Sequence, residues 1–390
     1  MKFILIPDSF KGTLSSFRIC QIMEEQIYKY FPDSTFISVP VADGGEGSVD
    51  AFLAATGGKR EYLTVKNPYF EDIESFYGLI DQGKTAVIEM ASCAGLPLVE
   101  DRKNPALTTT YGVGQMILSA AEKGAEKIIV GLGGSATNDG GCGAAAAVGI
   151  CFYDENGTEF IPTGGTTKNI ARIDFSGKNK LLDHTEIITM CDIDNPMYGP
   201  LGASYVFGPQ KGADPETVKK LDEGIQNLSQ VLSKELGKDI SQVPGTGAAG
   251  AMGAGMMAFF GSRLKMGIET VLDTVHFDNM IQDADFIFTG EGKLDSQSLR
   301  GKAISGIAKR AQKQGKPVIA VVGGCQDSEI EKVYETGVTA VFPINRLPQD
   351  FEISRYYSEE NLKYTMDNIA RLMKTGLKTS GNCREDQEIL

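Results

Sequence analysis

Short apolar segments with the pattern of strands alternate with helical segments at both ends of the chain, and this alternation limits the possible folds more than any other feature. Cys20, Met23, Ile27 and Tyr30 recur at helical spacing and give the first helix one apolar stripe. The expected strands cover residues 3–6, 35–39, 285–289, 317–322 and 338–342, and the expected helices cover residues 16–30 and 302–314. Strands that alternate with helices favour a parallel, doubly wound α/β sheet.

The middle of the chain is less regular and is expected to form a second α/β domain. Its expected strands cover residues 85–90, 127–132, 149–153 and 186–191. One amphipathic helix carries Val218, Leu221, Ile225, Leu228 and Leu232. We therefore expect a discontinuous, Rossmann-like domain formed by residues 1–60 and 270–375, an inserted α/β domain at 61–269, and a flexible tail at 376–390.

The composition excludes several classes of protein. The 390 residues carry a net charge of −13, so nucleic acid and anionic membranes would find no basic field to bind. His184 and His276 are the only histidines, which argues against a histidine-based triad or a multi-histidine metal site. Seven scattered cysteines suit a reducing compartment. The N-terminal apolar run is too short for a signal peptide, so we expect a soluble, cytoplasmic protein.

The segment GLGGSATNDGG (131–141) follows an expected strand and supports two interpretations. Gly131, Gly133 and Ala136 match the dinucleotide-binding fingerprint, and Asp154 follows at about the expected distance. That interpretation makes the protein an NAD(P)-dependent oxidoreductase of a small hydroxy acid. However, Asn138 and Asp139 stand where a pyrophosphate-binding helix would begin, and a carboxylate there repels phosphate. A metal ion between carboxylate and phosphate would resolve the conflict and favour a different phosphate chemistry.

Two more glycine loops follow the first two expected strands. In PDSFKGT (7–13), Lys11 could meet phosphate charge and Ser9 could donate a hydrogen bond, but an ordinary helix cap with a solvated lysine fits equally well. In VADGGEG (41–47), Asp43 could bind a metal-bound phosphate or a substrate hydroxyl. A glycine turn stabilised by the aspartate is the alternative.

Later loops carry further candidates. Asp192, at a strand end, could accept a hydroxyl proton or hold Mg²⁺, or could form a turn before Asn195-Pro196. Lys211, between glycines, suits a phosphate or carboxylate, although a plain exposed turn fits nearly as well. In TGEGKLDS (289–296), Glu291 and Asp295 could share a metal beside a lysine; a salt-bridged turn is the alternative. The small residues of 244–250 permit either backbone approach to a ligand or close helix packing.

The chain has several glycine loops that carry carboxylates and lysines. Such loops suit phosphoryl transfer, because this reaction depends on positioning the substrates and neutralising the charge of the phosphates. The chain lacks the P-loop and protein-kinase signatures. Seven segments, in order, resemble the bacterial type 1 glycerate kinase family along residues 1 to about 375. They are PDSFKGTLS (7–15), PVADGGEG (40–47), GLGGSATNDGG (131–141), CDIDNP (191–196), FGPQKGA (207–213), PGTGAAGAMGAG (244–255) and TGEGKLDSQS (289–298).

This resemblance implies ATP- and Mg²⁺-dependent phosphorylation of D-glycerate to 2-phosphoglycerate, in a two-domain α/β protein with its active site in the cleft between the domains. It leaves monomer or homodimer open. Motif positions then suggest Asp192 as the leading candidate for the catalytic base, with Asp295 as its rival, and Lys11 as a group that neutralises charge. The remaining expected substrate- or phosphate-binding residues are Asp8, Ser9, Lys211, Gly133, Gly134, Ser135, Asn138, Gly290, Gly292 and Lys293, and the expected Mg²⁺ ligands are Asp43, Glu291 and Asp139. A non-catalytic sugar-acid sensor is a further alternative.

Overall fold

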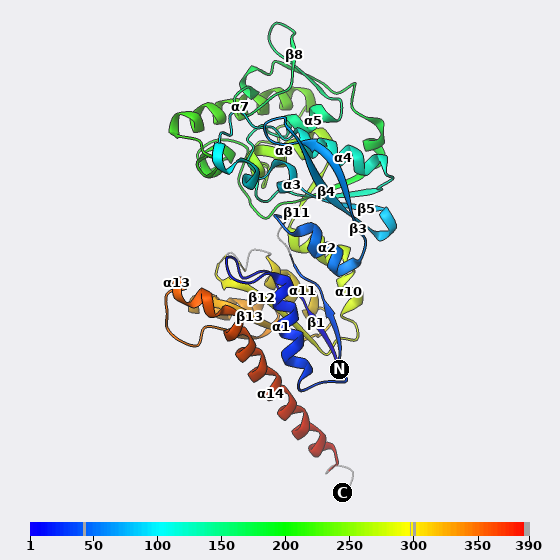
Figure 1. The fold of residues 1–390 in the computed structure, drawn as a ribbon, viewed down its shortest axis with the longest axis vertical. Helices are drawn as coiled ribbons and strands as arrows, with labels where there is room; N and C mark the ends of the chain where they lie inside the picture. The colour runs from blue at the N-terminus through cyan, green and yellow to red at the C-terminus, as the bar shows by residue number, and fades with distance from the viewer. Residues whose placement is uncertain (42–43, 297, 299–301, 386–390) are drawn as a thin grey trace. The chain divides into compact units, whose positions relative to one another are not determined.

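Strands from the two ends of the chain form one five-stranded sheet in the computed structural model, which describes residues 1–41, 44–296, 298 and 302–385. All neighbouring strands are parallel, in the order β14-β13-β12-β1-β2. Figure 1 labels β13, β12 and β1 of this sheet. They are β1 (Lys2–Leu5), β2 (Thr35–Ser38), β12 (Phe286–Leu294), β13 (Val318–Cys325) and β14 (Val338–Pro343). The parallel sheet that the alternating pattern predicts is therefore present.

Helices cover both faces of this sheet because its strands are apolar on both sides. Phe3 and Leu5 pack with α1 and α14 on one face, whereas Ala320 and Val322 pack with α11 and α12 on the other. Ser15 begins α1 by accepting a hydrogen bond from the backbone of Arg18. The helices are α1 (Ser16–Tyr28), α9 (Gly267–Thr274), α10 (Phe277–Met280), α11 (Ala303–Gln312), α12 (Asp327–Glu335), α13 (Phe351–Ser354), η6 (Arg355–Tyr357) and α14 (Ser358–Glu385).

The strand order locates the ligand-binding edge of this sheet. Numbered within the sheet, the strands run 2-1-3-4-5, which is the flavodoxin-like order rather than the expected Rossmann order. The order reverses between β1 and β12, whose residues Leu5 and Phe288 are paired. Ligands of doubly wound sheets bind at the carboxyl ends of the strands at such a reversal. The loop after β1 and the end of β12 meet there.

A six-stranded mixed sheet organises the middle of the chain. Its order is β11-β10-β6-β5-β4-β3; the first four strands are parallel, and β3 and β4 form an antiparallel edge. The strands are β3 (Lys59–Lys66), β4 (Asp72–Ile80), β5 (Thr85–Glu89), β6 (Lys127–Gly131), β10 (Glu186–Met190) and β11 (Arg263–Lys265). A small antiparallel sheet adds β7 (Cys151–Tyr153), β8 (Glu159–Phe160) and β9 (Arg172–Asp174).

The helices of this region include the predicted amphipathic helix, α7. Asp214 caps it, Pro215 opens it and Gly237, in a left-handed conformation, ends it. The apolar stripe predicted along this helix is buried, which confirms that prediction. The helices are α2 (Ser48–Thr56), η1 (Asp81–Gly83), α3 (Ala91–Ala94), η2 (Leu96–Arg102), α4 (Tyr111–Glu122), α5 (Cys142–Ala147), η3 (Thr167–Asn169), η4 (Lys180–His184), α6 (Ala203–Phe207), η5 (Pro209–Lys211), α7 (Pro215–Leu236) and α8 (Ala248–Phe260).

The chain divides into two compact units, one formed by Met1–Ala42 with Ile268–Leu390 and the other by Asp43–Gly267. The first crossing therefore precedes the expected position at residue 60, because α2 packs on β4 and β5 of the second unit. The second crossing lies close to the expected residue 270. The expected flexible tail differs too, since α14 continues to Glu385; residues 386–390 lie outside the described part.

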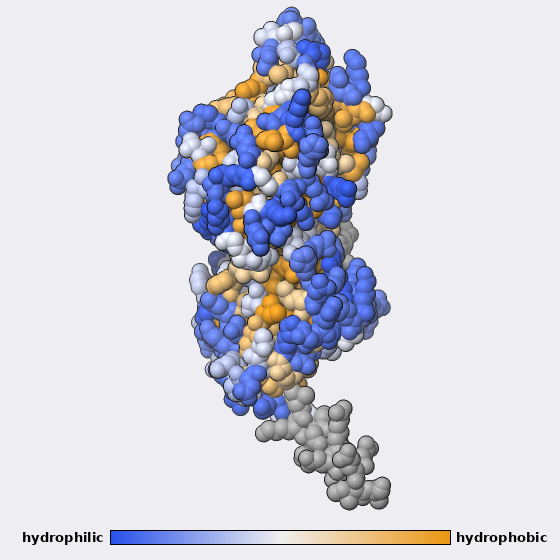
Figure 2. Space-filling model, turned by 90° about the vertical axis from the view of Figure 1, so that its right-hand side faces the viewer, coloured by the Kyte–Doolittle hydropathy of each residue, from blue (hydrophilic) through white to orange (hydrophobic). Residues whose placement is uncertain are grey.

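The surface in view is mostly hydrophilic, and hydrophobic residues appear on it in small, separate patches (Figure 2). Such scattered patches are normal for a folded protein in water. Within the described part of the chain, no helix is long and apolar enough to span a membrane.

Candidate active site

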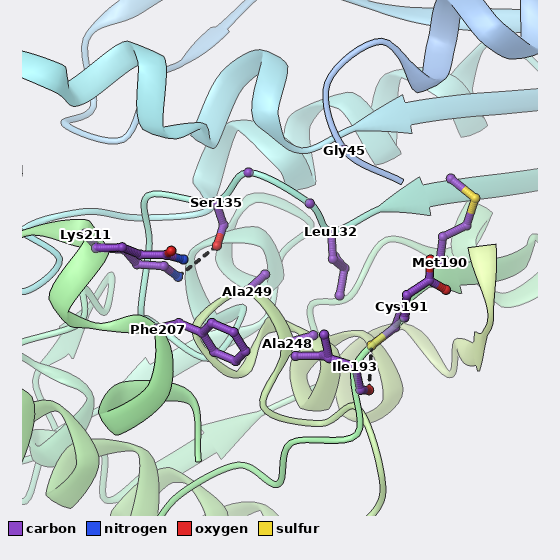
Figure 3. A pocket seen from close by; sticks show the side chains of 14 residues that line it. Gly45, Leu132, Ser135, Met190, Cys191, Ile193, Phe207, Lys211, Ala248 and Ala249 are labelled. Atoms are coloured by element: carbon purple, nitrogen blue, oxygen red, sulfur yellow. Dashed lines mark hydrogen bonds between the residues drawn. The ribbon is translucent and has the colours of Figure 1, made fainter. Parts of the chain in front are cut away.

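A cavity of about 270 Å³ lies at the carboxyl ends of β6 and β10, within the second unit (Figure 3). The segment after β6, the end of β10, the segment around η5 and the start of α8 form its walls. The residues lining it are Gly45, Leu132, Gly133, Gly134, Ser135, Met190, Cys191, Asp192, Ile193, Phe207, Gln210, Lys211, Ala248 and Ala249. Strand ends of this kind are the usual location of ligand sites in α/β proteins.

Lys211 is a buried cation that lines this cavity. Its side chain is 1% exposed, and its Nζ donates to Ser135 Oγ at 2.8 Å and to the Thr137 carbonyl at 2.6 Å (Figure 3). Burial lowers the pKa of Lys211 to about 7, although the negative charge of Asp139 opposes the shift. Gly212 turns the chain at φ 96°, a conformation that favours glycine. The exposed turn considered as an alternative for Lys211 is therefore wrong.

Asp139 organises the segment beneath the cavity. Its buried carboxylate accepts hydrogen bonds from the backbone and hydroxyl of Thr110, at 2.7 and 2.9 Å, and from the amides of Gly141 and Gly143, at 3.1 and 3.2 Å. Burial raises its pKa, and these hydrogen bonds oppose the rise. Asp139 is fully buried, is not among the residues lining the cavity and has both oxygens engaged by donors, so the geometry does not support it as a Mg²⁺ ligand.

The glycines after β6 serve the close packing of backbone segments and do not form a dinucleotide site. A Cβ on Gly131 would lie 2.3 Å from the Gly44 carbonyl oxygen, and the Gly133 amide already donates to that oxygen. No helix begins until α5 at Cys142. The helix that directly follows the strand and turn of a dinucleotide site is therefore missing here. The predicted phosphate-binding role of the Gly133 amide is likewise unsupported, since that N–H is occupied.

Asn138 lies beneath the cavity rather than in its wall. It is fully buried, and its side-chain amide donates to Ser204 Oγ at 3.1 Å. The turn that opens α8 covers it: residues Ala249, Gly250 and Ala251 are all left-handed, with φ of 54°, 69° and 63°. A Cβ on Gly250 would meet the Thr137 carbonyl oxygen at 2.1 Å. The close packing considered for this small-residue segment is therefore present, and Ala248 and Ala249 also line the cavity, where the approach of the backbone to a ligand stays a prediction.

Asp192 lines the same cavity as Lys211. It follows β10, is half-buried, and its Oδ1 accepts a hydrogen bond of 2.6 Å from the amide of Gly267. This contact holds one carboxylate oxygen in place. Asn195, which the alternative interpretation placed in a turn after Asp192, donates its side-chain amide to the Leu201 carbonyl.

Glu89 is a buried residue that the sequence analysis did not identify. It ends β5, is 3% exposed, and accepts hydrogen bonds from the amides of Gly47 and Val49 at the start of α2. A carboxylate at a helix N-terminus is favourable because of the helix dipole. Glu89 thereby holds the turn that contains Gly45, which lines the cavity. An acid at the end of an apolar strand was the signal that could have revealed it.

In the first unit, the loop after β1 folds onto the end of β12. The amide of Asp8 donates to the Gly290 carbonyl, and the amide of Ser9 donates to Asp8 Oδ1. A Cβ on Gly292 would lie 3.2 Å from the backbone nitrogen of Lys11. Lys11 itself is exposed. The predicted group of Asp8, Ser9 and Lys11 thus lies beside the predicted β12 segment.

The glycines of that segment continue β12 instead of forming the expected loop. Gly290 pairs with Val321 of β13, and a Cβ on Gly290 would clash with the Val321 carbonyl oxygen. The predicted phosphate cradle of Gly290 and Gly292 is therefore unsupported, because both residues lie within a strand. Lys293, also in β12, is exposed.

Glu291 is the buried acid of this unit. It is 7% exposed, and its Oε1 lacks a hydrogen-bond partner among the described residues. Burial raises its pKa to about 7, with further contributions from the negative charges of Asp8 and Asp295 and opposition from Ser298 and Lys302. Asp43, the third predicted Mg²⁺ ligand, lies outside the described residues.

Comparison with known proteins decides the family. The profile of the glycerate kinase family matches residues 3–374. The chain belongs to this family. A glycerate kinase from Bacillus cereus is 44% identical, covering 96% of this chain and 98% of its own, and a glycerate 2-kinase from Escherichia coli is 41% identical, covering 98% and 100%. A crystal structure from Salmonella typhimurium LT2, assigned as glycerate kinase 2, aligns with a TM-score of 0.85 and 38% identity over 97% of this chain and 99% of its own.

Membership of the glycerate kinase family makes the chain a kinase, and kinases use ATP as phosphoryl donor. The acidic group of the first unit fits a divalent cation in chemical terms, because Mg²⁺ prefers carboxylate oxygens and needs only one or two beside substrate phosphates. Glu291 offers a buried oxygen that lacks a hydrogen-bond partner within the described part of the chain, and Asp8 and Asp295 lie near enough to affect its pKa. No cluster of three or more potential metal-ligating side chains occurs among the described residues.

Proposed function

We propose that this glycerate kinase transfers the γ-phosphoryl group of ATP to the 2-hydroxyl of D-glycerate and releases 2-phosphoglycerate and ADP. The observation that carries the proposal is the cavity of the second unit, which a buried lysine and an aspartate both line. A small hydroxy acid needs one cation for its carboxylate and one acceptor for its hydroxyl proton. Lys211 and Asp192 supply these two groups.

Asp192 is the proposed acceptor of the hydroxyl proton. It lines the same cavity as Lys211, and the hydrogen bond from Gly267 orients its carboxylate. The rival, Asp295, lies in the first unit beside Glu291. A base must lie within hydrogen-bond reach of the proton that it accepts. The position of Asp192 in the cavity wall therefore favours it over Asp295.

Glu291, with Asp8 or Asp295, is the proposed holder of Mg²⁺ in the first unit. When bound, the ion would neutralise phosphate charge. Lys11 and Lys293 are exposed lysines that lie close to these carboxylates in the sequence. They add positive charge, and phosphoryl transfer depends on neutralising the charge of the phosphates. The reversal of strand order between β1 and β12 supports a nucleotide site at this edge.

A coupled assay with ATP, Mg²⁺ and D-glycerate tests the proposal. Asp192→Asn should lower kcat by about 100-fold, because a positioned acid–base group contributes about that factor or more. Asp295→Asn, at the rival position, should retain more activity than Asp192→Asn, because Asp295 is only one of two alternative partners of Glu291 at the proposed Mg²⁺ site. Absence of turnover by the parent enzyme would refute the proposed reaction, and near-full activity of Asp192→Asn would refute the base assignment.

The regiochemistry needs a separate measurement. The Escherichia coli relative is a glycerate 2-kinase, and this relationship supports phosphorylation at the 2-hydroxyl. Phosphorus NMR of the product distinguishes 2-phosphoglycerate from 3-phosphoglycerate. A signal from the 3-phosphate alone would contradict the proposal.

A further inference from the structure

Lys211 is a buried cation whose hydrogen bonds to described residues go to neutral groups. Its described hydrogen bonds go to the hydroxyl of Ser135 and the carbonyl of Thr137. Asp139 attracts it from beneath, but the Asp139 oxygens bind Thr110, Gly141 and Gly143 instead. A buried charge without a direct partner is costly, so proteins keep one where a ligand supplies the partner. The Lys211 ammonium has three donors, one more than its described contacts use.

The rest of the cavity wall indicates what kind of anion fits. Apart from Lys211, the charged side chain lining the cavity is Asp192, and the wall between them is largely apolar, with Leu132, Ile193 and Phe207. One cation matches one negative charge, whereas the several charges of a nucleotide triphosphate would remain unneutralised. The cavity of about 270 Å³ also suits a small molecule, since one water occupies roughly 30 Å³ of liquid.

We propose that Lys211, held in place by Ser135, binds the carboxylate of the hydroxy acid in the second unit and makes the enzyme select acids over their uncharged analogues. This inference rests on the proposed function and identifies the specificity-determining residue of its acid site. The nucleotide would bind elsewhere, so Lys211 affects the Michaelis constant of the acid and leaves that of ATP unchanged.

Binding of the carboxylate should be linked to proton uptake. The titratable groups around the Lys211 ammonium are Asp139 beneath it, and Cys191 and Asp192 in the cavity wall. Because burial holds the pKa of Lys211 at about 7, much of this side chain is neutral at pH 8 before the acid binds. An anion in contact raises that pKa, so the lysine takes up a proton. If Asp192 or Asp139 took up the proton instead, proton uptake would not disappear when Lys211 is replaced.

Titration calorimetry with D-glycerate, without ATP, tests the inference on the whole protein. In buffers of different ionisation enthalpy at pH 8, wild type should take up close to one proton per bound acid, and at pH 6 close to none. This measurement needs no variant. Lys211→Met should bind D-glycerate about 100-fold more weakly, as expected when a buried contact to a charged ligand is lost. It should also lose the proton uptake and bind glycerol as wild type does.

Lys219→Met is the matched control, because it removes an exposed lysine nearby on α7. It should keep wild-type affinity and proton uptake. If wild type phosphorylates D-glycerate but shows no proton uptake at pH 8, or if folded Lys211→Met keeps wild-type affinity, the inference fails while the proposed function stands. If wild type neither binds nor phosphorylates D-glycerate, the proposed function itself fails.

Discussion

At the scale of single residues, burial decides what each charged group can do. Lys211 and Asp139 are both fully enclosed, yet one faces a cavity and the other is surrounded by hydrogen-bond donors. Lys211 is therefore available to a ligand, whereas Asp139 serves to hold the backbone around it. Glu291 is buried too, and its Oε1 lacks a hydrogen-bond partner among the described residues.

Lys211 should make stability depend on pH. Its pKa is about 7 in the folded chain and near 10.5 when unfolded, so the unfolded chain binds more protons between these values. The free energy of unfolding of wild type, relative to Lys211→Met, should therefore rise with pH across this window, by at most about 1.4 kcal/mol per pH unit. Denaturant unfolding at pH 7.5 and 9.5 measures the difference. A relative stability that falls with rising pH would contradict the buried position of Lys211.

At the scale of secondary-structure elements, glycines set the distances between backbones. Gly131 lets β6 approach the turn at Gly44, Gly290 lets β12 approach β13, and Gly250 lets the start of α8 approach Thr137. In the sequence, such glycines also fit ligand cradles. A pattern of glycines does not distinguish a close protein backbone from a close ligand, because both require the absence of a side chain.

The two ends of α8 offer a matched test of this role. Gly250 and Gly261 are both left-handed, with φ of 69° and 65°, but an added Cβ clashes only at Gly250, since nothing lies within 4 Å at Gly261. Gly261→Ala should cost about 1 kcal/mol of stability from backbone strain. Gly250→Ala should cost roughly 3 kcal/mol or more and weaken acid binding, because Thr137 holds Lys211.

Thermal unfolding and D-glycerate titration of both variants measure these effects. Equal destabilisation by the two substitutions would show that strain alone matters at Gly250 and that its contact with Thr137 does not.

At the scale of the whole molecule, each unit contains a hydrophobic core of its own. One core draws on β1, α1, β12, β13 and α14, and the other on the strands and helices between β3 and α8. The second unit is also continuous in sequence, whereas the first needs both ends of the chain. The cavity with Lys211 and Asp192 lies wholly within the continuous unit.

A fragment of residues 43–267 should therefore fold by itself. Circular dichroism should show a cooperative thermal transition, because the fragment retains its sheet and the helices that cover it. A shorter fragment, 43–190, lacks α7 and α8 and serves as control; it should not unfold cooperatively. A fragment 43–267 without a cooperative transition would contradict the independence of this unit.

The sequence by itself determined the parallel sheet, most of its strands, the amphipathic helix α7 and the family, because periodicity and motifs are local properties of the chain. It placed Lys211 and Asp192 among the candidates for the site. Only the tertiary structure decided that Lys211 is buried, that Asp139 faces amide donors and that Gly133 and Gly290 pack against backbone. Those properties depend on which distant segments meet, and a strand or loop motif contains no information on its partner across the fold.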